Sequence, residues 1–188
     1  MPGSRSLFRH LTRLLAGCVL LAATALESGA VSREYDIKAA FLYNFATFVE
    51  WPPQTFASEG GPIVIGVLGV DPFGSSLDEM VSGPRPNARA LEVRRFNRLD
   101  EMSHCHILYV SSSEARRLKE ILRQLHGLPV LTVGDLPGFA EAGGAIGFVT
   151  STRVALVINP ETIRASNLAV SAKLYKVARV VGSENHSP

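Results

Sequence analysis

Four short apolar runs constrain the fold of this chain more strongly than any other feature. Each is rich in β-branched residues and lies between Gly, Pro or polar residues; they are PIVIGVLG (62–69), CHILYVS (105–111), PVLTVG (129–134) and AIGFVTSTRVALVIN (145–159). Continuous runs of this kind are typical of strands buried on both faces, as in parallel sheets. The last run is long enough for two strands around Ser151 and Thr152, so we expect a hairpin there.

Segments with helical spacing separate these runs. Segment 111–127 begins with a serine that can cap a helix, carries a leucine-rich stripe and ends at Gly127. Residues 71–83 indicate a turn and a short helix, and residues 88–96 alternate like a strand nearer the sheet edge. We therefore expect an α/β fold: a single layered domain with a mainly parallel sheet, helices on both faces and an antiparallel edge hairpin.

The segment EYDIKAAFLYNFATFVEWP (34–52) holds three of the nine Phe and the only Trp. It is too short and too interrupted to span a membrane, which takes about 20 apolar residues. Its spacing predicts an amphipathic helix that ends near Glu50 and packs on the sheet. The side chains expected on its inner face are Ile37, Phe41, Asn44, Phe45 and Phe48, widened by Leu42 and Val49.

The tail from 160 to 181 also predicts helix. Pro160 suits a first helical turn. The stripe expected for the last helix consists of Leu168, Ser171, Leu174, Tyr175, Ala178 and Val181. Residues 182–188 are expected to be a disordered tail.

Residues 1–30 have the order of a secretory signal. Three Arg precede the apolar run LLAGCVLLAATAL, and small residues follow it, so cleavage after Ala30 is expected. The domain organisation is then a signal peptide (1–30), an α/β domain (31–181) and the tail. LAGC, ending at Cys18, offers the alternative of a lipoprotein. Removing residues 1–30 takes away three Arg and one Glu, so the net charge falls from +2 to zero, which argues against nucleic-acid binding.

One cysteine, Cys105, would remain after cleavage, so no disulfide can form within the mature chain. Its apolar surroundings predict a buried, inert thiol. On a strand, the neighbouring His104 and His106 would share a face and could ligate a metal, but no third ligand is indicated. We expect no metal site.

Polar residues follow three of the predicted strands. Ligands of parallel sheets bind outside the carboxyl ends of the strands, which makes this edge a candidate small-molecule cleft. The alternative is that these aspartates and serines are helix caps and turn residues. The candidate ligand-binding residues are Asp71, Phe73, Ser112, Asp135 and Phe139.

No pattern indicates catalysis. The glycines of GVLGVDPFG match neither a dinucleotide-binding nor a P-loop motif. The sequence contains no G-x-S-x-G, H-E-x-x-H or C-x-x-C motif. We expect no enzymatic activity and no cofactor.

Five segments, taken in order, resemble the YfiR family of small exported bacterial proteins and cover roughly residues 34–181. They are EYDIKAAFLYNFATFVEWP, PIVIGVLGVDPFG, CHILYVSSSE, GLPVLTVGDLPGFAEAGGAIGFV and INPETIRASNLAVSAKLYKVARVV. The resemblance implies a non-catalytic periplasmic α/β protein, often a homodimer. Such proteins bind the periplasmic sensor domain of an inner-membrane diguanylate cyclase and repress it, which lowers cyclic-di-GMP and biofilm formation. An outer-membrane-associated protein can sequester them.

This sequence departs from characterised repressors in lacking their disulfides, so a redox-linked mechanism is not expected. For the partner surface we predict the terminal hairpin and last helix, which hold more apolar residues than one helix face and one strand face need. The predicted contact residues are Val154, Leu156, Leu174, Tyr175 and Val181. The alternative function is a periplasmic small-ligand sensor or carrier that uses the strand-end cleft.

Overall fold

The computed structural model describes residues 33–83 and 88–182. The chain divides between Tyr35 and Asp36 into two units, which are described separately. In the first, the described residues 33–35 are helical. The predicted signal peptide, its cleavage site, Cys18 and residues 183–188 lie outside the described residues. Among the described residues no helix is long and apolar enough to cross a membrane.

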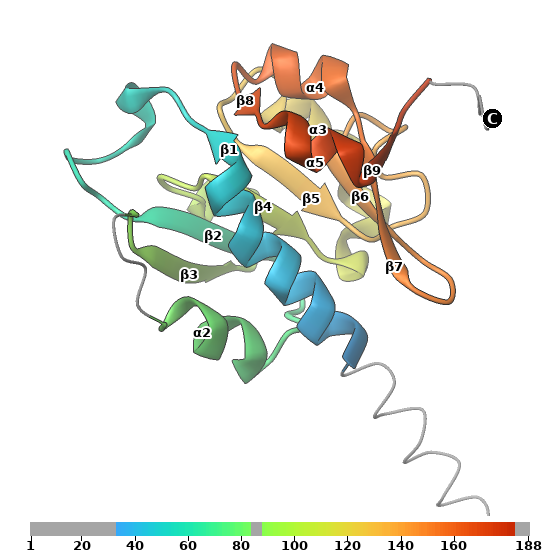
Figure 1. The fold of residues 1–188 in the computed structure, drawn as a ribbon, viewed down its shortest axis with the longest axis horizontal. Helices are drawn as coiled ribbons and strands as arrows, with labels where there is room; N and C mark the ends of the chain where they lie inside the picture. Colours follow the sequence, from blue (N-terminus) through green and yellow to red (C-terminus); the bar gives the residue numbers. More distant parts are fainter. Residues whose placement is uncertain (1–32, 84–87, 183–188) are drawn as a thin grey trace, which may run out of the picture. The chain divides into compact units, whose positions relative to one another are not determined.

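A seven-stranded sheet in the order β3-β2-β4-β5-β6-β7-β9 forms the second unit (Figure 1). β2 and β4 are buried along their whole length, as the continuous apolar runs predict. The bounds are β2 Ile63–Leu68, β3 Leu91–Phe96, β4 Ile107–Val110, β5 Leu131–Gly134, β6 Ile146–Thr150, β7 Val154–Ile158 and β9 Ala178–Val180.

The pairing within this sheet is mainly parallel, and only the hairpin of β6 and β7 is antiparallel. The predicted fold class is therefore confirmed. The hairpin is not the outermost part of the sheet, because β9 pairs in parallel with β7 beyond it. The opposite edge is β3, which was predicted to lie near an edge.

Helix α3 (Leu118–Leu125) covers one face of the sheet and follows the 3-10 helix η3 (Ser112–Arg117). Ser111 caps η3 by accepting a hydrogen bond from the Ser113 amide. The inner side of α3 packs on strand residues that include Leu108 and Val110 of β4. The helix side chains buried there are Ile121, Leu122 and Leu125, which lie on the stripe predicted for this segment.

Within the second unit, the opening helix covers the other face of the sheet with residues 36–48 (Figure 1). Phe45 is fully buried, and its ring stacks 6.3 Å from that of Phe148 on β6. Register places Phe148 on the face opposite Val110, because Val110 pairs with Gly134, and Gly134 with Gly147.

The inner face of this helix is rotated from the predicted one. Ile37 and Asn44 are exposed, whereas Leu42 is fully buried. Phe41 and Phe48 are half-buried. The helix side chains that are fully enclosed are Lys38, Ala39, Leu42 and Phe45. The helix then passes directly into β1 (Val49–Glu50) rather than continuing to Glu50.

The prediction of a continuous last helix was wrong. The tail instead forms α4 (Pro160–Ala165), β8 (Ala169–Val170), α5 (Ala172–Lys176) and β9. Asn167 has φ of 54°, which ends α4, and β8 pairs antiparallel with β1. Long-range strand pairing therefore overrides the helical spacing. The short remaining elements are η1 (Pro53–Thr55), α2 (Ser75–Val81) and η2 (Leu99–Glu101).

Candidate functional site

The strand order has one reversal that marks a candidate site. From β2 the chain adds β3 on one side and then crosses to add β4 on the other. Crevices between strand ends at such a reversal are the usual ligand sites of parallel sheets. Here the crevice would lie between the segment after β2 (Gly69, Val70) and the start of η3 after β4.

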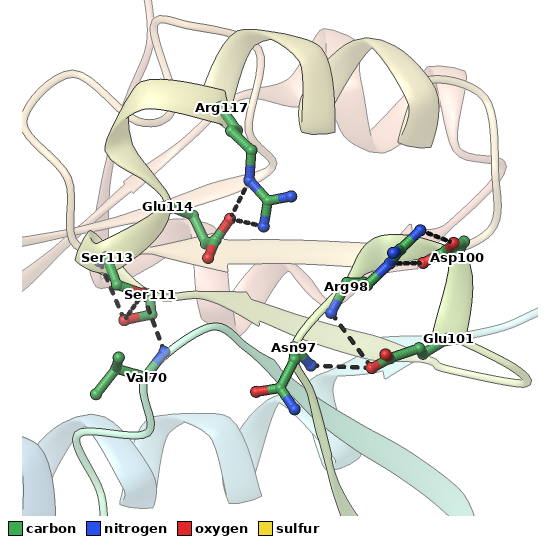
Figure 2. Close-up of polar contacts among 9 residues, drawn as sticks. All are labelled: Val70, Asn97, Arg98, Asp100, Glu101, Ser111, Ser113, Glu114 and Arg117. Carbon is green, nitrogen blue, oxygen red and sulfur yellow. Dashed lines mark hydrogen bonds and ion pairs between the residues drawn. The ribbon is translucent and has the colours of Figure 1, made fainter.

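The protein's own side chains close this crevice. The Val70 amide donates to Ser113 Oγ at 3.0 Å, and Ser113 Oγ lies 3.2 Å from Ser111 Oγ (Figure 2). The Ser111 amide donates to the Leu68 carbonyl at 3.0 Å. Gly69 has φ of 89°, and a Cβ there would lie 2.4 Å from Ser113 Oγ. Only glycine allows this approach, and the two segments contact each other directly at this point.

A buried carboxylate follows the serines. The Glu114 residue is only 8% exposed, and Arg117 folds over it (Figure 2). Arg117 Nε and Nη2 donate to Glu114 Oε2 at 2.9 and 2.5 Å. A buried carboxylate needs such compensation, so this pair serves the fold.

The end of β3 is closed in the same way. Glu101 of η2 reaches back and accepts from the amides of Asn97 and Arg98 at 3.1 and 3.3 Å (Figure 2). The Arg98 guanidinium binds Asp100 at 2.5 and 2.9 Å and lowers the pKa of that carboxyl. The Glu101 contacts cap the start of η2, and the pair of Arg98 and Asp100 is an exposed ion pair beside them.

Of the predicted ligand residues, Asp71 and Phe73 lie together but serve structural roles. Asp71 Oδ1 accepts from the Phe73 amide at 2.7 Å, which is a turn contact, and Oδ2 accepts from Arg95 at 2.7 Å. Arg95 also binds Asp78 and lowers its pKa. The Phe73 ring is buried, edge-on to Tyr109 at 4.8 Å.

Asp135 makes an ion pair that the sequence analysis missed. Its Oδ2 lies 2.6 Å from Lys38 Nζ, and both side chains are buried, at 9% and 2% exposure. The pair joins the opening helix to the end of β5. The signal in the sequence is a lysine inside an otherwise apolar helix face, but nothing local identifies its partner 97 residues away.

Phe139 and Ser112 complete the predicted set. The Phe139 ring is 1% exposed, and a Cβ on Gly134 would lie 2.5 Å from it. It therefore fills the core and does not wall a cleft. Ser112 is exposed at the start of η3. The Phe73 and Phe139 rings are thus both packed in the core, and the ligand-binding role predicted for these residues stays a prediction.

The HCH segment is also structural. His104 is exposed outside β4, whereas His106 is buried and its Nδ1 accepts from the Val64 amide at 3.0 Å. Burial lowers the pKa of His106 to about 4. Cys105 is buried, as predicted. Within residues 33–83 and 88–182, no three His, Cys, Asp or Glu side chains are grouped to hold a metal ion.

A hollow of about 570 Å³ lies between α3 and α4, away from the predicted residues. Basic side chains line it from α3, and acidic ones from the loop after Phe139 and from α4. The charged and titratable residues at this hollow are Lys119, Arg123, His126, Glu141 and Glu161. This mixture of charges does not specify a ligand class.

The chain matches the model of the YfiR/HmsC-like family over residues 35–179. The chain belongs to this family. A comparison with curated proteins found no match.

For this YfiR/HmsC-like protein, the partner surface predicted from sequence needs revision. Leu156 and Leu174 are 1% and 3% exposed, so they belong to the core and not to a contact surface. Val154, Tyr175 and Val181 are half-buried. The prediction missed Val177, which lies between α5 and β9 and is 66% exposed.

Proposed function

We propose that this protein is an exported regulator that binds the periplasmic sensor domain of an inner-membrane diguanylate cyclase and represses cyclic-di-GMP synthesis. The observation that carries the proposal is the family match, which extends from the opening helix to β9. An outer-membrane-associated protein that sequesters the regulator is part of the same proposal. No catalytic step is assigned to it.

The closed strand ends favour binding through the surface over binding in a cleft. The polar side chains at the reversal of strand order bond to one another and to the backbone, and the two phenylalanines are packed inside. A small-ligand carrier needs a concave site that encloses most of its ligand. The arrangement of these residues offers none at the predicted position.

Repression by binding requires a difference in affinity. The protein must bind the inactive state of the sensor more tightly than the active one, since equal affinities leave the equilibrium unchanged. We assign the contact to the surface formed by Val154, Tyr175, Val177 and Val181, which we call the C-terminal surface. An apolar centre with a polar rim is the usual composition of such contacts.

The test is a deletion strain that carries a cyclic-di-GMP reporter. We expect a higher reporter signal in the deletion strain, restored by the wild-type gene, and recovery of a cyclase when tagged protein is used to capture solubilised membrane proteins. An unchanged signal together with no captured cyclase would contradict the regulator and favour the ligand carrier.

A pair of matched variants tests the assigned surface. Val177→Lys introduces a charge at an apolar residue that is 66% exposed, and Val70→Lys does the same at a residue 70% exposed beside the closed strand ends. We expect Val177→Lys to lose repression and Val70→Lys to repress like the wild type. The reverse result would move the partner contact to the strand-end edge.

A further inference from the structure

We propose that two copies of this chain associate edge to edge through β3, which pairs antiparallel with the β3 of the second copy and joins the two sheets. The surface is the outer edge of Leu91–Phe96. The homodimer implied by the family resemblance has no assigned contact, and the geometry of β3 points to this one.

The first support is the unpaired edge. β3 is the last strand of the sheet and pairs with β2 alone among the described strands. The carbonyls of Ala90 and Phe96 accept from the amides of Ile63 and Gly69 in β2, both at 2.9 Å. Because successive residues of a strand point their backbone groups to opposite sides, the even-numbered residues face β2.

The outward N–H and C=O groups therefore belong to Leu91, Val93 and Arg95. The residues of this strand from Leu91 to Arg94 are half-buried and Arg95 is exposed, unlike β2, which is buried throughout. A six-residue edge of this kind is a template for pairing with another chain. With three outward residues from each copy, antiparallel pairing satisfies both edges at once.

The second support is the charge pattern of the strand. Glu92 and Arg94 flank Val93 symmetrically, and their side chains lie on the same face, joined by hydrogen bonds of 2.7 and 3.2 Å. Their side chains remain 43% and 34% exposed. A two-fold axis through Val93 places Glu92 of each copy opposite Arg94 of the other. These would be non-hydrogen-bonded pairs of the antiparallel ladder, in which the opposed side chains lie closest together.

No other nearby register has this property. An axis through Glu92 or through Arg94 places two like charges directly opposite each other, which is destabilising. The outward backbone groups agree with the axis through Val93, because the two copies of Val93 then exchange both of their hydrogen bonds. The strand is thus self-complementary in charge and in hydrogen bonding, which identifies a second copy as the occupant.

Sedimentation velocity of the protein purified from the cell after export tests this surface. Glu92→Arg leaves arginine at both position 92 and position 94, and Arg94→Glu leaves glutamate at both, so each variant alone opposes like charges across the axis. We expect each to dimerise at least about tenfold more weakly than the wild type. Mixed in equal amounts, the two variants should form a heterodimer, because every opposed pair is then of opposite charge.

The mixture separates the contact between copies from effects within one chain. Both variants lose the internal pair of Glu92 and Arg94, and mixing restores only the pairs between chains. Glu120→Arg is the control, since it makes the same charge reversal in an exposed ion pair with Arg123 on α3, away from β3, and should dimerise like the wild type. Circular dichroism melting verifies that each variant is folded.

Three outcomes would overturn the proposal. The first is a wild-type monomer at about 100 μM, where a complex of micromolar Kd is mostly formed. The second is a pair of variants that dimerise alone as well as the wild type. The third is a mixture of folded variants that stays monomeric. Val93→Pro, which removes an outward N–H and spares the ladder with β2, should also give a folded monomer.

Discussion

Cys105 illustrates how single residues are fixed by their closest neighbours. A Cβ on Gly66 of β2 would lie 2.8 Å from both Cys105 Sγ and the Phe96 ring, so the absent side chain of the glycine makes room for the thiol. Cys105 Sγ lies 3.1 Å from the Ile107 carbonyl. Burial raises the pKa of this thiol to about 12. The thiolate form is thus disfavoured in the folded protein.

This pKa predicts how stability depends on alkaline pH. In the unfolded chain the thiol ionises near pH 9, and in the folded chain near 12, so the unfolded state releases its proton first and stability falls as pH rises from 9 to 12. Between pH 8 and 10.5 we expect this group to cost about 2 kcal/mol of unfolding free energy. Urea unfolding of the wild type and of Cys105→Ala at both pH values measures the difference.

Cys105→Ala should lose less stability over this interval than the wild type, although it starts lower because of the packing it gives up. The native thiol should also react slowly with a thiol reagent at pH 8 and fast in urea. Rapid labelling of the native protein, or equal pH dependence in both proteins, would contradict the burial of this side chain.

At the scale of elements, we expect a few buried contacts to supply most of the free energy that holds the opening helix on the sheet. Phe45 is fully buried against Phe148, and Lys38 pairs with Asp135 beneath the same helix. Other apolar residues of the helix, such as Ile37, remain outside at 48% exposure. The buried side chains of one narrow stripe, and not all apolar residues of the helix, are therefore expected to contribute most to the free energy of unfolding.

Two alanine substitutions on this helix should differ sharply. Phe45→Ala removes a ring from the core, and we expect a loss of about 3–5 kcal/mol in unfolding free energy. Ile37→Ala, the control on the exposed side, should change it by less than about 0.5 kcal/mol. Chemical denaturation of both variants gives the comparison. A loss below about 1 kcal/mol for Phe45→Ala would mean that this face is not part of the core.

At the scale of the whole molecule, β3 and β9 of the C-terminal tail form the two opposite edges of the seven-stranded sheet. β9 pairs with β7 only after α4, β8 and α5 have intervened. The two proposed contacts use different parts of this arrangement, the C-terminal surface for the regulatory partner and β3 for a second copy. A dimer through β3 therefore leaves both C-terminal surfaces available, and one dimer can present two.

The processed form of the chain is a further prediction at this scale. The order of charged, apolar and small residues in positions 1–30 predicts export with cleavage after Ala30. Intact-mass spectrometry of protein from the periplasm should show a chain that starts at Val31, and Cys18→Ser should leave that mass unchanged. An acylated chain starting at Cys18, lost in Cys18→Ser, would establish the lipoprotein instead.

The sequence by itself determined the fold class and the strands from β2 to β7, but not β1, β8 and β9. The buried strands β2, β4 and β5 were the clearest, because a strand buried on both faces must be apolar along its whole length, and that pattern is local. The sequence also determined the burial of Cys105 and the hairpin around Ser151 and Thr152. The candidate ligand residues were assigned to a shared edge because the carboxyl ends of parallel strands meet there. That rule cannot distinguish an open edge from one that the protein's own side chains have closed.

Only the tertiary structure decided which segments meet across long separations. Residues 168–181 have helical spacing, but part of this segment forms β8, which pairs with β1, and β9, which pairs with β7. Pairing with a sheet edge provides partners for backbone N–H and C=O groups, and this tertiary context overrides the helix propensity of the segment. The inward-facing Lys38 of the opening helix is paired in the same long-range way, with Asp135, a carboxylate 97 residues away. A buried charge must find a partner, and no local pattern of residues can say where in the chain that partner lies.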